Sequence, residues 1–226
     1  ENQNVHSLKG TDFLIISHPD FLTQAEELID LHHEIDWLNI NIVTPELIYN
    51  EFSCGATDIS GIRDFIKHLY DNDGQRLKYV LLFGDASYDF RNKSGKVCFV
   101  PTYESDKTGS LSAVVTDDFF VCLDDGEGDV EDGWSSKPDI AIGRFPVSTD
   151  EQAENIVNKI RRYVEKSETT MNAWRNRFTF ITDDDLPMFI NDSEGVVDLI
   201  EKQDSHVVMN KIYLDAYNQQ ATSSGQ

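Results

Sequence analysis

The amino-acid sequence predicts an α/β protein with a mainly parallel sheet flanked by helices. The main observation is an alternation along the chain. Short apolar runs bounded by polar residues alternate with segments in which apolar residues recur every three or four positions, as in βαβ units. In addition, 39% of the 226 residues are hydrophobic, so the chain can bury a core despite its net charge of −22. At roughly 150 residues per domain, this length suits one large domain or two small ones.

The first part of the chain has five apolar runs that favour buried strands. These runs are residues 13–16, 40–43, 79–83, 119–123 and 139–143. The spacing of apolar residues predicts helices over 22–32, 59–69 and 153–164. Asp20 is a candidate cap for the first helix, and Ser148 with Glu151 has capping-box spacing before the third. Between the strands, residues 84–111 form a long irregular segment of the kind that is usually functional.

A polar stretch at residues 165–176 marks a predicted boundary between two units. The alternation then restarts with a strand over 178–181, a helix over 189–203 and a strand over 207–214. Two strands are too few for an independent sheet. We therefore expect the second unit either to pack on the first or to have the rest of its sheet outside the given chain. Neither end shows a signal peptide or a closing element, so we expect a portion of a longer protein.

The composition excludes several classes of protein. With 19 Lys and Arg against 41 Asp and Glu, the chain lacks the clustered cations that bind nucleic acid or an anionic membrane surface. No apolar run approaches the length of a transmembrane helix. Three cysteines are too few for a disulfide framework. The dinucleotide-binding, Walker and Gly-x-Ser-x-Gly motifs are absent.

Polar residues follow the predicted strands, and in open α/β sheets ligands collect at the carboxyl ends of strands. His18 is a candidate general base after the first strand, and Asp85 is a candidate crevice residue after the strand at 79–83. A surface histidine and a turn-capping aspartate are the favoured alternatives.

Three adjacent aspartates follow the strand at 178–181, namely Asp183, Asp184 and Asp185. Like charges repel, so local propensity alone would not gather them. A functional role therefore competes evenly with an exposed acidic loop.

The densest acidic stretch is residues 117–132, with eight carboxylates in sixteen residues. Hard oxygen ligands on a glycine-containing loop suit calcium, although the spacing is not that of an EF-hand. A hydrated acidic hairpin is the favoured alternative. The weak calcium candidates are Asp117, Asp118, Asp124, Asp125, Glu127 and Asp129.

The three cysteines, Cys54, Cys98 and Cys122, carry no local sign of a catalytic thiolate. Such a thiolate needs a nearby histidine and an electropositive, partly exposed position. Cys122 alternates with Phe120 in a predicted strand, which favours a core position.

Taken in order, several segments resemble the gingipain-type cysteine peptidases, and the resemblance runs from about Asp12 to Gln226. The segments are 79–89, 100–103, 116–120, 138–147 and 212–217. The resemblance implies a caspase-like peptidase domain of two α/β subdomains, with residues 11–170 as the first and residues 174–226 as the start of a second, truncated one. In this family the catalytic histidine lies in a Gly-His-Gly motif and the catalytic cysteine ends a later strand. None of the six histidines here is flanked by glycine.

The resemblance is strongest to the branch that removes C-terminal sorting signals in type IX secretion in Bacteroidetes. It implies part of a cysteine endopeptidase that is inactive by itself, because its dyad is absent. One of the three aspartates would orient the catalytic histidine. The implied partners are polypeptides with C-terminal sorting signals and other secretion components, and the implied place is the cell surface, outer membrane or periplasm. No cofactor is required, although family members bind calcium.

Two alternatives to a peptidase fragment stay open. The first is a non-catalytic module that binds peptide or calcium on a peptidase-like fold. The second, a receiver-like signalling domain, is disfavoured because no further Asp and Lys follow at suitable strand ends. For the isolated chain we expect either a dimer through the truncated sheet edge or a poorly ordered end after about Leu214.

Overall fold

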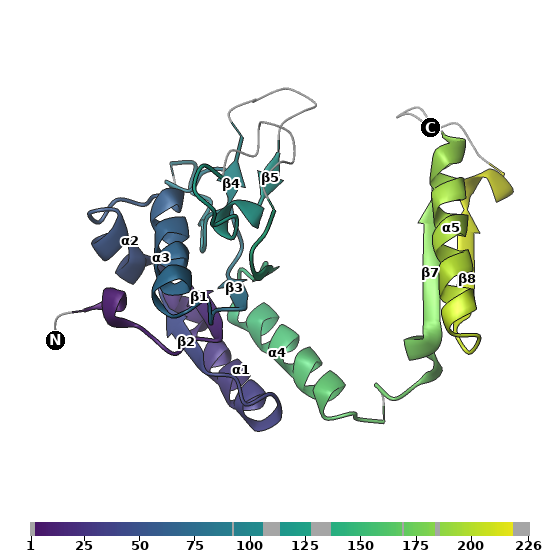
Figure 1. Ribbon diagram of the computed structural model, residues 1–226, viewed down its shortest axis with the longest axis horizontal. Coiled ribbons are helices and arrows are strands. Elements are labelled where there is room, and N and C mark those ends of the chain that lie inside the picture. Colours follow the sequence, from purple (N-terminus) through teal and green to yellow (C-terminus); the bar gives the residue numbers. More distant parts are fainter. Residues whose placement is uncertain are drawn as a thin grey trace. The chain divides into compact units, whose positions relative to one another are not determined.

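The computed structural model describes residues 3–91, 93–105, 114–127, 137–168, 170–183 and 186–218. The chain divides into two compact units, Glu1–Arg161 and Arg162–Gln226 (Figure 1). The polar stretch at 165–176, where the sequence predicts a boundary, begins shortly after this division. Among the described residues, no helix is long and apolar enough to cross a membrane.

The first unit contains a parallel sheet of four strands, which confirms the predicted α/β fold class. The strands are β1 (Phe13–Ser17), β2 (Ile40–Val43), β3 (Tyr79–Phe83) and β6 (Ala141–Phe145). Their order is β2-β1-β3-β6. In the centre, Ser17 at the end of β1 pairs with Phe83 at the end of β3. The chain adds β2 on one side of β1 and then β3 on the other side, so the order in which strands are added reverses between β1 and β3. Such a point is where α/β folds place their ligand crevice.

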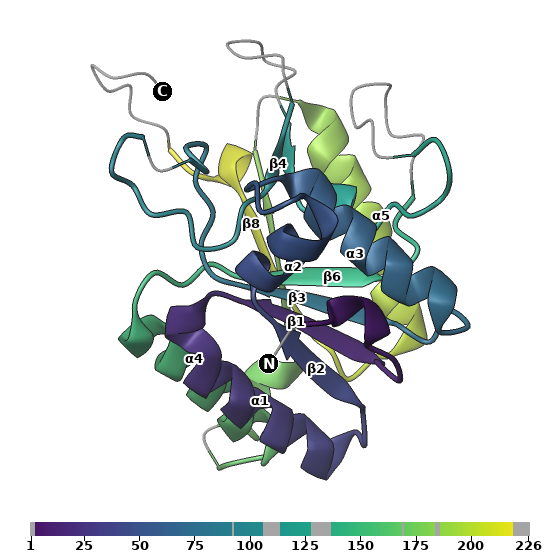
Figure 2. The same ribbon diagram turned by 90° about the vertical axis from the view of Figure 1, so that its left-hand side faces the viewer.

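Helices cover both faces of this sheet (Figure 2). On one face lie α1 (Leu22–Ile35) and α4 (Asp150–Val164), and on the other lie α2 (Pro45–Phe52) and α3 (Ile59–Asn72). Because side chains alternate along a strand, Ile15 packs with the α1 and α4 core, whereas Leu14 and Ile16 pack with the α2 and α3 core. This two-sided burial explains why the central strands are almost entirely apolar.

The predicted strand at 119–123 is wrong. Residues Asp118–Phe120 form a 3-10 helix, η3, and the residues that follow it are irregular. Their backbone groups are satisfied locally, by side chains and by the Asp139 amide, which donates to the Val121 carbonyl at 2.9 Å, rather than by a strand ladder. The Val121 amide donates to Asp118 at 3.0 Å, and the Arg63 side chain donates to the Cys122 carbonyl. The apolar run reports burial, since Phe120 to Leu123 are all buried, but it does not fix the backbone conformation.

Several element ends also differ from the predictions. The strand predicted at 139–143 lies two residues later, as β6. The cap of α4 is Thr149 rather than Ser148, because the Thr149 hydroxyl accepts from the Gln152 amide at 3.3 Å. Asp20 does not cap α1. Instead His18 caps a preceding 3-10 helix, η2 (Pro19–Phe21), and α1 has no side-chain cap.

Shorter elements complete the first unit. Helix α2, which the sequence pattern does not predict, begins with Pro45 in its first turn, a position that suits proline. Strand β4 (Tyr103–Glu104), within the long irregular segment, pairs antiparallel with β5 (Val115–Thr116), which follows that segment. A 3-10 helix, η1 (Val5–Ser7), lies against α2 and α3.

The second unit has a two-stranded parallel sheet and one long helix. Strand β7 (Arg177–Thr182) pairs with β8 (Val208–Tyr213), and α5 (Pro187–Gln203) connects them. The 3-10 helices η5 (Ala173–Asn176) and η6 (Leu214–Ala216) flank the two strands. On α5, Glu194 accepts hydrogen bonds from Lys211 at 2.7 Å and from the Tyr213 hydroxyl at 2.8 Å, which fixes the helix to β8.

Candidate functional site

The carboxyl ends of β1 and β3 place His18 and Asp85 on neighbouring strands of the first unit. The His18 amide donates to the carbonyl of Phe83 at 3.1 Å, so the chain leaves β1 directly beside the end of β3. The Asp85 carboxylate accepts from its neighbour, the Ala86 amide, at 3.0 Å and from the Ser148 hydroxyl at 3.3 Å. Asp85 therefore has the turn role that the sequence favours.

The backbone between Phe83 and Asp85 requires a glycine at position 84. Its φ of +148° lies in a range that side chains disfavour, and a Cβ built there would stand 2.7 Å from the Cβ of Phe99. The close approach lets the segment around Phe99 run across the end of β3. The amides of Phe99 and Val100 then donate to the Asp85 carbonyl at 3.0 and 3.2 Å.

The Arg144 guanidinium on β6 binds the backbone around Gly84 and Val100. It donates to the carbonyls of Gly84, Val100 and Pro101 at 2.8, 2.7 and 3.0 Å. It also pairs with both carboxylate oxygens of Asp117, at 2.8 and 2.7 Å. All five N–H groups of the guanidinium are thereby used, which is the fork geometry that suits arginine and not lysine.

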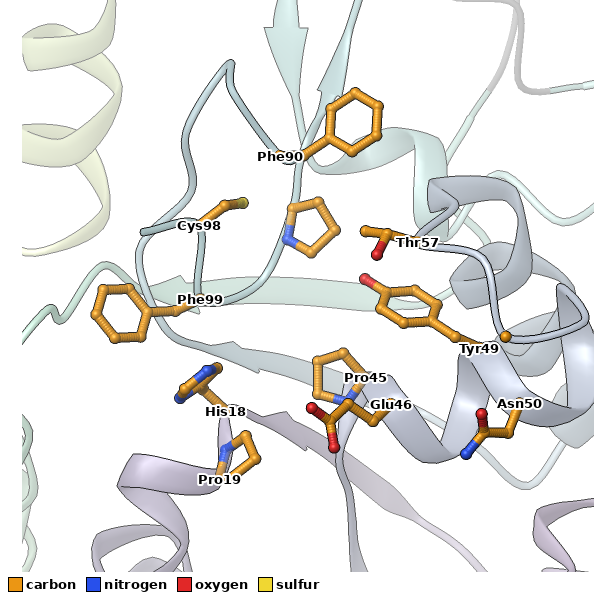
Figure 3. A pocket seen from close by; sticks show the side chains of 12 residues that line it. His18, Pro19, Pro45, Glu46, Tyr49, Asn50, Thr57, Phe90, Cys98 and Phe99 are labelled. Atoms are coloured by element: carbon orange, nitrogen blue, oxygen red, sulfur yellow. The ribbon is translucent and has the colours of Figure 1, made fainter. Parts of the chain in front are cut away.

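A cavity of about 400 Å³ opens where β1 and β2 end (Figure 3). His18 and Pro45, just beyond these two strands, line it together with Tyr49 of α2 and with Cys98 and Phe99 of the irregular segment. The cavity is thus formed by elements that the sheet edge, Gly84 and Arg144 hold in place. The sequence alone does not predict this cavity, because its walls come from three separate parts of the chain.

The three aspartates of the second unit lie after β7. Asp183 is exposed and directly follows Thr182, the buried last residue of that strand, which pairs with Tyr213. Asp184 and Asp185 lie outside the described residues. Asp183 therefore occupies the carboxyl end of a strand, as the sequence predicts, and its chemical role stays a prediction.

Cys98 and Cys122 show the opposite of thiolate activation. Burial raises the pKa of the Cys98 thiol above its usual value, and burial likewise raises the pKa of Cys122. Cys54 is exposed in the turn after α2. A nucleophilic cysteine needs a lowered pKa, so neither Cys98 nor Cys122 is prepared for attack.

The candidate calcium ligands do not converge in the part of the chain that the structure describes. There, no three His, Cys, Asp or Glu side chains come together in a group that could hold a metal ion. Both oxygens of Asp117 already face Arg144, and one also accepts from the Thr102 hydroxyl at 2.8 Å. Asp125 lies 3.5 Å from the Lys67 ammonium. Asp129 lies outside the described residues, so calcium binding stays a sequence-based prediction.

Comparison with known proteins defines the class to which this chain belongs. The model of peptidase family C25 matches residues 6–226, so the chain is a member of that family. This confirms the resemblance drawn from the sequence. No curated protein matches the chain.

Among solved structures, the crystal structure of dimeric latent PorU from Porphyromonas gingivalis is 32% identical, with a TM-score of 0.66. The match covers 77% of this chain and 17% of the PorU chain. The complex of the RgpB pro- and mature domains, also from P. gingivalis, is 17% identical with a TM-score of 0.66, covering 93% of this chain and 43% of that one.

The Arg-specific cysteine proteinase gingipain R is likewise 17% identical, with a TM-score of 0.67. That match covers 99% of this chain and 45% of the gingipain chain. At this identity the two gingipain structures show a shared fold. The chain thus spans less than half of each of these three relatives.

Proposed function

We propose that the chain is part of a cysteine endopeptidase that removes C-terminal sorting signals from polypeptides exported by type IX secretion. The observation that carries this proposal is the contrast in identity between the relatives. The chain is 32% identical to PorU but 17% identical to gingipain R, although the TM-scores are nearly equal. Similarity beyond the shared fold therefore favours the PorU branch.

In the proposed reaction, a cysteine thiolate attacks the carbonyl carbon of the scissile peptide, and the leaving amine takes a proton from the catalytic histidine. Water, or an amine at the cell surface, then attacks the acyl-enzyme and releases the thiol. Neither catalytic group is assigned to this chain, because none of its histidines is flanked by glycine and burial raises the pKa of Cys98 and of Cys122. By itself the chain would therefore be inactive, since the catalytic groups act as a unit.

The contribution of this chain to the chemistry would be a carboxylate after β7. Asp183, Asp184 or Asp185 would accept a hydrogen bond from the catalytic imidazole, hold its tautomer and stabilise its cation. These aspartates are positioning residues in this scheme. The place of Asp183 at the carboxyl end of a parallel strand supports the role, because such ends converge on one edge of a sheet.

The proposed substrates, partners and location follow from the similarity to PorU. Substrates would be polypeptides with C-terminal sorting signals, and the protein would act with other secretion components at the cell surface, outer membrane or periplasm. A dimer would be consistent with PorU, whose crystal structure is described as dimeric.

The test uses the longer gene product and a fluorogenic peptide that spans a sorting-signal junction. We expect cleavage that a cysteine alkylating reagent abolishes, and no turnover by the 226-residue chain alone. Among Asp183→Asn, Asp184→Asn and Asp185→Asn, one variant should lower kcat by about 10²- to 10⁴-fold and change the pH profile of kcat/KM. Asp192→Asn, at an exposed position on α5, is the matched control. Cleavage that survives alkylation, or three aspartate variants with wild-type kinetics, would overturn the corresponding part of the proposal.

A further inference from the structure

An N-terminal strap, residues 3–8, lies against α2 and α3 and includes η1. Val5 is 9% exposed and belongs to the core on this face of the sheet, and Leu8 packs against the same core. Among the described residues, the backbone-to-backbone hydrogen bonds of the strap are all internal, from the Ser7 amide to Asn4 and from the Leu8 amide to Val5. The strap can therefore leave its place without breaking a strand ladder or another helix.

One carboxylate on α2 accepts most of the bonds that hold the strap. Glu51 accepts from the amides of Val5 and His6 at 2.9 and 3.2 Å. It also accepts from Nδ1 of His6 at 2.6 Å and from the side-chain amide of Gln3 at 3.0 Å. A hydrogen bond to an ionised acceptor is stronger than a neutral one. Loss of this one charge would therefore weaken four bonds at once.

Aromatic rings at the end of α2 and on α3 make the other contacts of the strap. The His6 ring stacks on Phe52, with centroids 4.3 Å apart. Nε2 of His68 donates to the His6 carbonyl at 3.0 Å. Phe52 in turn meets Phe65, in the core of α3, edge to face at 5.4 Å. Release of the strap would thus uncover one face of Phe52.

The strap also reaches the cavity beyond β1 and β2 through α2. The Gln3 side chain donates to the Leu47 carbonyl and accepts from the Asn50 side-chain amide, both at 3.0 Å. Asn50 lines that cavity (Figure 3). Helix α2 has eight residues, which is too short for a helix to be stable alone, so its position depends on contacts such as these.

We propose that residues 3–8 form a releasable strap, which holds α2 and the Asn50 side of the cavity in place while it is bound and frees them when it opens. Opening is local, because the parallel sheet keeps all its ladders. The inference goes beyond the proposed peptidase function and does not depend on it, since every contact lies in the first unit and the test involves no catalysis.

Trypsin cleavage after Lys9 measures opening of the strap, with cleavage after Arg63, in the middle of α3, as the internal reference. Lys9 is exposed, but the strap before it is bound and the Gly10 amide after it donates to Asp73 at 2.6 Å. A protease cleaves a segment that has come away from the fold, so each rate reports how often that segment opens. We expect the cut after Lys9 to be at least about tenfold faster, because local opening needs less free energy than unfolding of α3.

A charge variant tests the role of the carboxylate. Glu51→Gln should speed the cut after Lys9 by about tenfold or more, because a neutral amide replaces the acceptor that four donors share. Glu46→Gln, at an exposed position at the other end of α2, is the matched control and should be cut at the wild-type rate. Equal rates after Lys9 and Arg63 in the wild type, or a wild-type rate in Glu51→Gln, would overturn the strap.

A variant in the strap itself tests the link to α2 and the cavity. Val5→Ala removes buried apolar contact and leaves α2 unchanged, so the cut after Lys9 should become about three- to tenfold faster. In the wild type, hydrogen exchange of the α2 amides should be faster than that of the β1 amides, and Val5→Ala should speed it by the same factor as the cut. Amides of α2 that exchange as slowly as those of β1, or that Val5→Ala does not change, would overturn the link.

Discussion

Arg144 and Asp117 form a two-pronged ion pair, with Nε to Oδ2 at 2.8 Å and Nη2 to Oδ1 at 2.7 Å. Their side chains are only 12% and 21% exposed. The remaining N–H groups of Arg144 hold the backbone at Gly84, Val100 and Pro101. A single side chain on β6 therefore connects the sheet to two parts of the irregular segment, at Gly84 and at Val100–Pro101.

Replacing this arginine should be costly even when the charge is kept. Arg144→Lys removes the planar fork and leaves carbonyls and part of Asp117 without donors, so we expect a loss of about 2–3 kcal/mol in the free energy of unfolding. Chemical denaturation measures it. Arg161→Lys, in an exposed pair with Glu27 at 3.6 Å, is the control and should change stability by less than about 1 kcal/mol. Equal effects of the two variants would contradict the role assigned to Arg144.

Gly84 should tolerate no side chain. In Gly84→Ala the new Cβ would meet Phe99 at 2.7 Å in a strained backbone conformation, so we expect a loss of about 2–4 kcal/mol and a shifted cavity wall. Gly143→Ala on β6, where a Cβ has nothing within 4 Å, is the matched control and should stay near wild type. Thermal melts of both variants decide the matter, and a Gly84→Ala chain as stable as the control would refute the close approach.

Glu51 should make the first unit sensitive to acid. Burial by itself raises its pKa, but hydrogen bonds from Val5, His6 and Gln3 outweigh burial and lower the pKa from 4.5 to about 2. A carboxyl whose pKa is lower in the folded chain stabilises it above pH 4.5, and this stabilisation is lost as the pH falls from 4.5 toward 2. We expect Glu51→Gln to be less stable than wild type at pH 7, with the difference shrinking over that range. A difference independent of pH would contradict this.

The sequence-based prediction of calcium at residues 117–132 has a direct measurement. A ligand that binds only the folded chain stabilises it by about 2.7 kcal/mol at one hundred times its Kd, which raises Tm by several degrees for a chain of this size. Under the calcium prediction, calcium raises Tm, magnesium does so less, and Asp124→Asn with Asp125→Asn reduces the rise. An unchanged Tm up to millimolar calcium would contradict the calcium prediction and favour its alternative, a hydrated acidic hairpin.

The second unit should associate in the isolated chain. Among the described residues, β7 and β8 pair only with each other, and apolar side chains such as Phe178 and Ile181 are exposed there. We expect light scattering to find a dimer, or hydrogen exchange to find weak protection after about Leu214. Ile181→Lys should then favour the monomer, while Val115→Lys, also at an exposed apolar residue, should not. A monomer with protected amides throughout 177–214 would show the prediction to be wrong.

The sequence predicts the central strands well because their burial is continuous. Of the two central strands, β3 has the predicted bounds and β1 extends one residue beyond them, since an apolar run between polar residues has few alternatives in a sheet covered on both faces. The run at 119–123 misleads because burial alone does not require a strand partner. Helix α2 is missed because eight residues give too short a pattern for helical periodicity.

Some residues of the candidate sites can likewise be placed from the sequence, and others cannot. Residues directly after a strand, such as His18 and Asp183, can be placed from sequence because a strand end is a local feature. The partners of Arg144 lie between 27 and 60 residues away along the chain. Tyr49 and Cys98 meet at one cavity through an equally long separation. No local pattern reports such contacts, and only the folded chain brings them together.

The short β4–β5 pair brings together two residues that are nine positions apart along the chain. Ser105 and Val114 are joined by two hydrogen bonds, at 2.9 and 3.0 Å, so both are held at one place beside the pair. Closing a loop costs only about 0.6 kcal/mol more for each doubling of its length. A reporter peptide or an epitope inserted between these residues should therefore leave the parallel sheet intact, which offers a way to label the protein where it acts.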